Sequence, residues 1–200
     1  MYDFLNAISC PAGFVASVLL TGWLVGLQAE AAPPKAEARI VILPCVERGD
    51  YHTCARITVS GDLGVDDGDI FVARTKGIDL AAVSLSGLGG SLLASIQIGE
   101  RIAAAHWVTW VAAGKECDSG CAVAWIAGRP HGMGVGAVVG FHAPYNTLDP
   151  DHADGTASAA IGAYLAGVGI PVEEIVNLIG HGPHDYRVVD SSGKIWETGE

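Results

Sequence analysis

Short apolar runs and longer amphipathic segments alternate along the chain from residue 39 onward. The short runs are rich in β-branched residues, and several are bounded by glycines, which is typical of strands in a sheet. They predict strands over residues 40–43, 56–59, 81–85, 107–111, 135–141 and 186–189. The last of these forms a predicted hairpin with a further strand over 194–196. The longer segments predict a short helix beginning at 70–73 and further helices over 91–105, 117–127, 156–166 and 171–179. Strands that alternate with helices indicate the α/β class.

Three residues mark helix ends within this pattern. Ser91 suits the N-cap of the helix that follows it, because a serine hydroxyl can accept a hydrogen bond from an unpaired N–H of the first turn. Pro171 suits the first position of a helix, since its missing N–H would have no partner there. Gly180 suits the position just past the end of the same helix.

The N-terminal segment differs from the rest of the chain. Residues 12–27 carry no charged side chain, but this run is shorter than the roughly 20 residues that a membrane-spanning helix prefers. Ala29-Glu30-Ala31 fits the small-residue cleavage pattern of a secretory signal, whereas residues 1–11 lack the usual Lys or Arg. A cleaved signal peptide, an uncleaved anchor and a buried core helix all stay open. We therefore divide the chain into a signal peptide or membrane anchor (1–31), an Ala/Pro/Glu-rich linker (32–38) and one domain (39–200).

Charge and cysteine content narrow the class of protein. The formal net charge is −11, and no basic cluster stands out. Because nucleic-acid binding rests on Lys and Arg contacts with phosphate, no nucleic-acid partner is predicted. An even number of cysteines beyond the N-terminal segment is typical of an exported protein with disulfide bonds, while buried thiols in a cytosolic protein are the alternative. These cysteines are Cys45, Cys54, Cys117 and Cys121, and their spacing matches zinc sites only weakly.

Three short motifs carry residues that suit catalysis. Gly89-Gly90 lies between a predicted strand and a predicted helix, where glycine lets a backbone N–H approach a bound group. Ser119 stands at the start of the predicted buried helix, so the N–H after it can face a developing oxyanion. His142 ends a predicted strand and is followed by Ala143-Pro144, which presents a base at the edge of a sheet. By itself, each motif is more typical of a tight turn, a helix cap or an ordinary histidine.

Taken together, the three motifs resemble those of Clp-type serine peptidases, and more closely those of their small exported relatives. The matching residues are Gly89-Gly90-Ser91, Ser119-Gly120 and His142-Ala143-Pro144. The resemblance covers roughly residues 55–145. It implies a ClpP/crotonase-like α/β fold of repeated ββα units. Leu88 stands where the family usually has proline before the glycine pair, which departs from its pattern.

The resemblance also implies a role for each residue. Ser119 would attack a carbonyl carbon, and His142 would take its proton and deliver it to the leaving group. The N–H groups of Gly90 and Gly120 would form the oxyanion hole. An acid near the C-terminus would orient the histidine, with Asp185 as the first choice and Asp190 as the competitor.

The implied function is that of an exported serine hydrolase, in particular a peptidase, located in the periplasm or secreted and requiring no cofactor and no metal. Its partners would be a peptide or protein substrate and further copies of itself, together with the membrane if the N-terminal segment is an anchor. The alternatives are a catalytically silent crotonase-type module for binding or assembly, and an acyl-thioester enzyme with a similar oxyanion hole. In this fold a Cys117–Cys121 bridge would brace the turn at Ser119, and Cys45–Cys54 would close an N-terminal hairpin.

Overall fold

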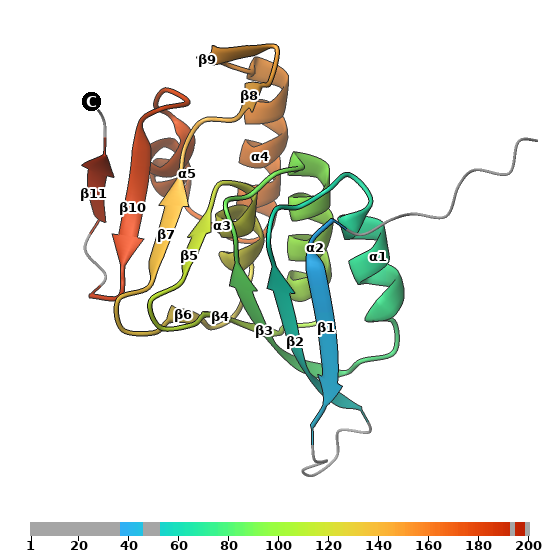
Figure 1. Cartoon of the computed structure of the whole chain (residues 1–200). Helices are drawn as coiled ribbons and strands as arrows, with labels where there is room; N and C mark the ends of the chain where they lie inside the picture. The colour runs from blue at the N-terminus through green and yellow to red at the C-terminus, as the bar shows by residue number, and fades with distance from the viewer. Residues whose placement is uncertain (1–36, 46–52, 193–194, 199–200) are drawn as a thin grey trace, which may run out of the picture. The chain divides into compact units, whose positions relative to one another are not determined.

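The structure is a computed structural model that describes residues 37–45, 53–192 and 195–198. The predicted signal or anchor segment (1–31) and residues 32–36 of the predicted linker lie outside these ranges. The described residues form a mixed α/β fold, which confirms the class that the alternating pattern predicted. Figure 1 shows its two main sheets with helices packed beside them.

The first sheet combines one antiparallel strand pair with a run of parallel strands. In spatial order its strands are β1 (Arg39–Pro44), β2 (Cys54–Ser60), β3 (Leu80–Ser86), β4 (Val108–Val111) and β6 (His131–Met133). β1 and β2 are antiparallel, whereas β2, β3, β4 and β6 are parallel. Parallel strands need crossover connections, and the helices α1 (Asp67–Arg74) and α2 (Leu92–Ala104) supply two of them. Alternate residues of the central strands, such as Ile57 and Val83, are buried in the core.

The second sheet contains the strands that lead to the predicted catalytic residues. Its order is β11 (Ile195–Thr198), β10 (Tyr186–Asp190), β7 (Val138–Phe141) and β5 (Glu116–Asp118). β5 and β7 are parallel with Asp118 opposite Gly140, while β10 is antiparallel to both β7 and β11. This register brings the ends of β5 and β7 side by side, immediately before Ser119 and His142.

Three helices and a small hairpin complete the fold. The helix α3 (Gly120–Trp125) is buried along its whole length and contacts strands of both sheets as well as α2. The hairpin of β8 (Tyr145–Asn146) and β9 (Asp149–Ala153) follows β7 and leads into α4 (Gly155–Gly167). The helix α5 (Val172–Ile179) packs on α4 and on β10. Figure 1 shows the hairpin beside the N-terminal end of α4.

The predicted helix caps are largely confirmed. Ser91 is the N-cap of α2, and its hydroxyl accepts the N–H of Ala94. Gly180 follows the last residue of α5, as predicted. Pro171 precedes α5 as its N-cap, so the prediction that it is the first helical residue is wrong by one position. This difference is small because a proline fits both positions without losing a helical hydrogen bond.

The structure corrects two predicted elements and adds three strands. The helix predicted over 117–127 is wrong at its start, because Cys117 and Asp118 belong to β5 and the helix begins at Gly120. The strand predicted over 135–141 is shorter and begins at Val138. β6, β8 and β9 were not expected, because their sequences are short and lack the apolar alternation that indicates a strand. The repetition of a ββα unit stays a prediction.

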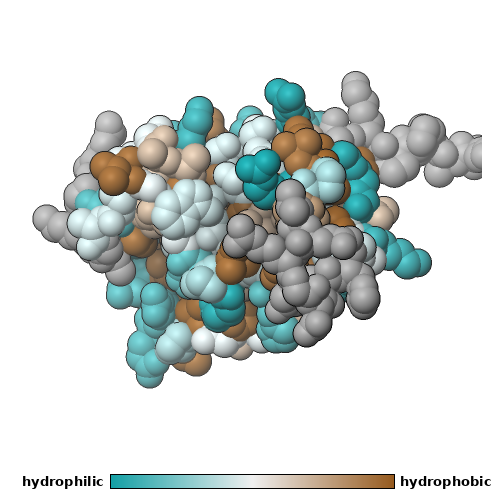
Figure 2. Space-filling view, turned by 90° about the horizontal axis from the view of Figure 1, so that it is seen from below, coloured by the Kyte–Doolittle hydropathy of each residue, from teal (hydrophilic) through white to brown (hydrophobic). Residues whose placement is uncertain are grey.

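The surface mixes polar and apolar side chains. Figure 2 shows one side of the molecule, on which hydrophobic residues form small separate areas among hydrophilic ones. The exposed apolar side chains include Val65 and Leu88, which border the cavity described below. Within the described ranges no helix combines the length and the apolar character needed to cross a membrane.

Candidate active site

Ser119 forms a sharp turn between a strand and a helix. β5 ends at Asp118 and α3 begins at Gly120, so a single residue connects them. Its φ of 53° and ψ of −122° are rare for a residue with a side chain, and such a conformation costs on the order of 1–3 kcal/mol. The surrounding sheet holds it in place, because the Ser119 N–H donates to the Gly140 carbonyl at 2.8 Å. A strained strand-to-helix turn of this kind is how α/β hydrolases present a nucleophilic serine.

The Gly89-Gly90 pair lies against this turn. The Leu63 N–H donates to the Gly89 carbonyl at 2.6 Å, and the Leu63 carbonyl accepts the N–H of Ser91 at 2.7 Å. These two hydrogen bonds form a short parallel bridge between Leu63 and Gly90. The bridge to Leu63 uses the Gly89 carbonyl and the Ser91 N–H, so the Gly90 N–H takes no part in it. Only glycine suits Gly90, because its φ is +116°.

Two backbone N–H groups border the space beside Ser119. A Cβ on Gly89 would lie 2.6 Å from the Ser119 Cβ and 2.8 Å from the Gly120 nitrogen, so the two segments touch. A Cβ on Gly120 would lie 3.6 Å from the Gly90 nitrogen. The Gly120 N–H is the first of a helix and has no intrahelical partner. The Gly90 and Gly120 amides are therefore neighbours, as two donors to one oxyanion must be.

His142 follows β7 directly and is buried, with 7% of its surface exposed. Its Nδ1 lies 2.7 Å from the Ala143 carbonyl oxygen. Because a carbonyl can only accept, Nδ1 carries the hydrogen, and Nε2 of the neutral ring keeps its lone pair. Burial holds the pKa of His142 below its ordinary value; the Ala143 carbonyl opposes this shift, and the charge of His184 adds to it. The ring is therefore neutral and able to accept a proton at neutral pH.

One cavity of about 460 Å³ brings these groups together. Ser119, His142, Gly90 and Gly120 all line it, so the structure gathers four of the predicted site residues in one place. Its volume falls within the range of roughly 300–1,000 Å³ that is usual for ligand pockets. The remaining wall is mainly apolar and includes Leu63, Val123, Phe141, Ile161 and Ile179.

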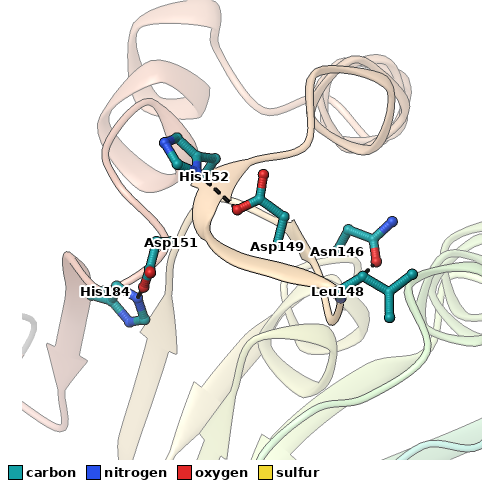
Figure 3. A network of polar contacts seen from close by, with 6 residues as sticks. All are labelled: Asn146, Leu148, Asp149, Asp151, His152 and His184. Atoms are coloured by element: carbon teal, nitrogen blue, oxygen red, sulfur yellow. Dashed lines mark hydrogen bonds and ion pairs between the residues drawn. The ribbon is translucent and has the colours of Figure 1, made fainter.

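The β8–β9 hairpin forms part of the cavity wall, because Tyr145 and Thr147 line it. Figure 3 shows how polar contacts hold this hairpin. Asp151 pairs with His184 of the loop before β10 at 3.1 Å, and Asp149 pairs with His152 within the hairpin at 2.8 Å. Both pairs are exposed, so each contributes little to stability, but the first joins the hairpin to the loop that precedes Tyr186.

Both candidate acids make hydrogen bonds within their own turns. The Asp185 carboxylate is exposed and accepts the N–H of Gly182 at 3.0 Å within its own turn. Asp190 accepts the N–H of Ser192 at 2.8 Å in the turn after β10. Neither residue lines the cavity. The geometry therefore leaves the third member of the predicted triad unassigned.

Asp118 is a notable group that sequence reasoning did not single out. It precedes Ser119 and is buried at 9% exposure. Burial, followed by the hydrogen bond and the charge of Glu116, raises the pKa of its carboxyl to about 7, although the Gly140 amide opposes the shift. The alternation of β5, which puts Glu116 and Asp118 on one face, is the sequence signal that could have indicated this pair.

Replacing Asp118 with asparagine is expected to stabilise the protein at high pH. An aspartate in the unfolded chain has a pKa of about 3.9. Because the folded value is higher, the contribution of Asp118 to the free energy of unfolding is fully present below about pH 4 and is lost as the pH rises through about 7. Asparagine resembles the protonated carboxyl. Urea unfolding at pH 8 should therefore show Asp118→Asn about 1–3 kcal/mol more stable than the parent, with a smaller difference at pH 5. Equal stability at both pH values would contradict the raised pKa.

The four cysteines form two close pairs. Cys117 and Cys121 are joined across the Ser119 turn with a Cα separation of 5.1 Å, and both are buried. Cys45 directly follows β1 and Cys54 begins β2, and the two are joined with a Cα separation of 5.4 Å. Both separations lie in the range that disulfides require. In the described part of the chain, no three His, Cys, Asp or Glu side chains gather closely enough to hold a metal ion.

Comparison with known proteins identifies a fold relative. No family model matches the sequence, and no curated protein is significantly similar to it. Among solved structures, the chain is similar to a mutant of the 1510-N membrane-bound stomatin-specific protease, with a TM-score of 0.51 and 13% identity over 68% of this chain and 72% of that one. A second mutant of this protease, in complex with a substrate peptide, has a TM-score of 0.49 and 17% identity over 61% and 63% of the two chains. The first likeness shows that the described domain has a fold similar to that of this protease.

Proposed function

We propose that this chain is an exported serine hydrolase that cleaves peptide bonds. One observation carries the proposal. Ser119 stands in a strained strand-to-helix turn and lines the same cavity as a buried neutral histidine and two adjacent backbone amides. Strain at a single side-chain-bearing residue is typical of functional sites.

The arrangement supplies each step of acyl transfer. Ser119 Oγ attacks the carbonyl carbon of the substrate while Nε2 of His142 accepts the hydroxyl proton. The N–H groups of Gly90 and Gly120 donate to the oxyanion of the tetrahedral intermediate. His142 then delivers the proton to the leaving amine, and a water molecule, activated by the same ring, releases the acyl group from Ser119.

Two observations support the choice of substrate and compartment. The structural neighbour is a protease, which supports a peptide as the substrate of a similar site. The two cysteine pairs at bonding distance support a protein that matures in an oxidising compartment, in line with the predicted signal or anchor segment.

Covalent labelling by a fluorophosphonate probe tests this function. The probe reacts with a serine that is activated by a base and an oxyanion hole, so we expect the folded domain to be labelled and Ser119→Ala to remain unlabelled. Ser158→Ala, which changes a serine in α4 that does not line the cavity, is the matched control and should label like the parent. A folded parent that resists the probe would favour the silent binding module instead.

The Cys117–Cys121 pair should contribute to both stability and reactivity. The double variant Cys117→Ala/Cys121→Ala loses the short loop that closes around Ser119, which is expected to cost about 2 kcal/mol of unfolding free energy. Because the serine is then held less firmly, labelling should slow at least about tenfold. Cys45→Ala/Cys54→Ala is the control, with a stability loss of about 2–3 kcal/mol and an unchanged labelling rate. Equal labelling rates in the two double variants would show that the first pair does not hold the turn.

A further inference from the structure

The surroundings of His142 differ from those of a Ser-His-Asp triad. In a triad, a carboxylate accepts the Nδ1 hydrogen, fixes the tautomer and stabilises the imidazolium that forms during catalysis. Here Nδ1 donates to the Ala143 carbonyl at 2.7 Å. Burial lowers the pKa of this ring, the Ala143 carbonyl opposes that shift, and the charge of His184 adds to it. The carbonyl fixes the tautomer, but as a neutral group it supplies less stabilisation of the positive charge.

Two tyrosine rings pack on the same imidazole. The Tyr186 ring lies 4.7 Å from the His142 ring between centroids, with an interplanar angle of 40°. The Tyr145 ring lies 5.6 Å away at 36°. Both separations are typical of aromatic pairs, and a cation within about 6 Å of an aromatic ring can be stabilised by its electron-rich face. Both tyrosines also line the cavity with Ser119.

The fold holds both rings in place from separate elements. Tyr186 begins β10 and reaches over Gly140 of β7, where a Cβ would lie 3.2 Å from the tyrosine ring. The absence of a side chain at Gly140 therefore leaves room for this ring. Tyr145 begins β8, whose hairpin is joined by Asp151 and His184 to the loop that precedes Tyr186 (Figure 3).

We propose that Tyr145 and Tyr186 are positioning residues for His142, and that their rings with the Ala143 carbonyl stand in for the triad carboxylate. The proposal rests on the proposed function, because the charge to be stabilised forms only when His142 takes the Ser119 proton. The tyrosine rings pack on the imidazole at a tilt, restrict its orientation and favour its protonated form. The site then works as a Ser119–His142 pair with an aromatic support, and Asp185 has no part in it.

Matched variants of Tyr186 and Asp185 test the proposal. Tyr186→Leu keeps an apolar side chain but removes the ring, so labelling by the fluorophosphonate should slow about tenfold. Tyr186→Phe keeps the ring and should stay within about threefold of the parent. Asp185→Asn should react like the parent. Circular dichroism confirms that each variant is folded, and NMR titration of the His142 ring should give a lower pKa in the leucine variant than in the phenylalanine variant.

The outcomes separate this proposal from the proposed function. An unlabelled parent would defeat the proposed function, yet the NMR titration would still report whether the Tyr186 ring favours the protonated histidine. Equal His142 pKa values in the leucine and phenylalanine variants would overturn the positioning role. A large loss of labelling in Asp185→Asn, with a normal rate in Tyr186→Leu, would overturn it too and restore the carboxylate triad.

Discussion

Replacing His142 with alanine is expected to slow the labelling of Ser119, and the hydrolysis of any peptide substrate, roughly 100- to 10,000-fold. The reason is that the serine hydroxyl is a weak nucleophile unless a base accepts its proton. In this structure Nε2 of His142 has a free lone pair, because Nδ1 carries the hydrogen that is donated to Ala143. The measurement is the second-order rate constant for labelling, compared between parent and variant at pH 7.5.

The same histidine should set the acid limb of the pH profile. The neutral ring is the active base, so the rate falls when the pH drops through the pKa of His142. Burial lowers this pKa, and the midpoint of the fall should therefore lie below the ordinary histidine value of about 6.5. A midpoint well above 6.5 would mean that another group controls the reaction or that a carboxylate faces the ring.

A remote histidine supplies the control for this variant. His152 is exposed in β9 and pairs with Asp149, and it does not line the cavity. His152→Ala should label at the parent rate. If His142→Ala labels as fast as His152→Ala while Ser119→Ala stays inert, then a base other than His142 serves Ser119.

Replacing Gly90 with alanine should lower the labelling rate about 100- to 1,000-fold, the usual effect of losing one oxyanion donor. The Gly90 φ of +116° is a conformation that side-chain-bearing residues rarely adopt. In addition, the new Cβ would lie 2.8 Å from the Leu63 nitrogen and would collide with the Leu63 carbonyl oxygen. The backbone must shift to relieve this contact, and the Gly90 N–H would then leave its position beside Gly120.

Gly77→Ala is the matched control for backbone strain. Gly77 also has a positive φ, +80°, but a Cβ there would meet no atom within 4 Å. This variant should lose about 1–2 kcal/mol of stability without a change in labelling. Thermal unfolding of both variants, followed by labelling below their transitions, separates stability from reactivity. A folded Gly90→Ala protein that labels at the parent rate would exclude the Gly90 amide as an oxyanion donor.

Local patterns in the sequence predicted several elements with small errors at their ends. The Ser91 cap and the glycine at 180 locate the helices α2 and α5, because capping depends on residues within one turn. The start of the buried helix at 117 was predicted wrongly, because the nearly uncharged run over 117–127 does not by itself separate Cys117 and Asp118 from the helix that follows. Their strand conformation comes from pairing with Val139 and Gly140, which are distant in the chain.

The sequence by itself determined the α/β alternation and the residue types available for chemistry, namely a serine, a histidine and a glycine pair at motif spacing. These follow from periodicity and local backbone preference, which neighbouring residues decide. Only the tertiary structure decided that Ser119 stands in a strained turn beside Gly90 and Gly120, that His142 bonds to Ala143, and that Asp185 faces its own turn. For the Ser119 turn and its two neighbouring amides, the physical reason is that they depend on the pairing of β5 with β7 and of Leu63 with Gly90, which join residues far apart in the sequence.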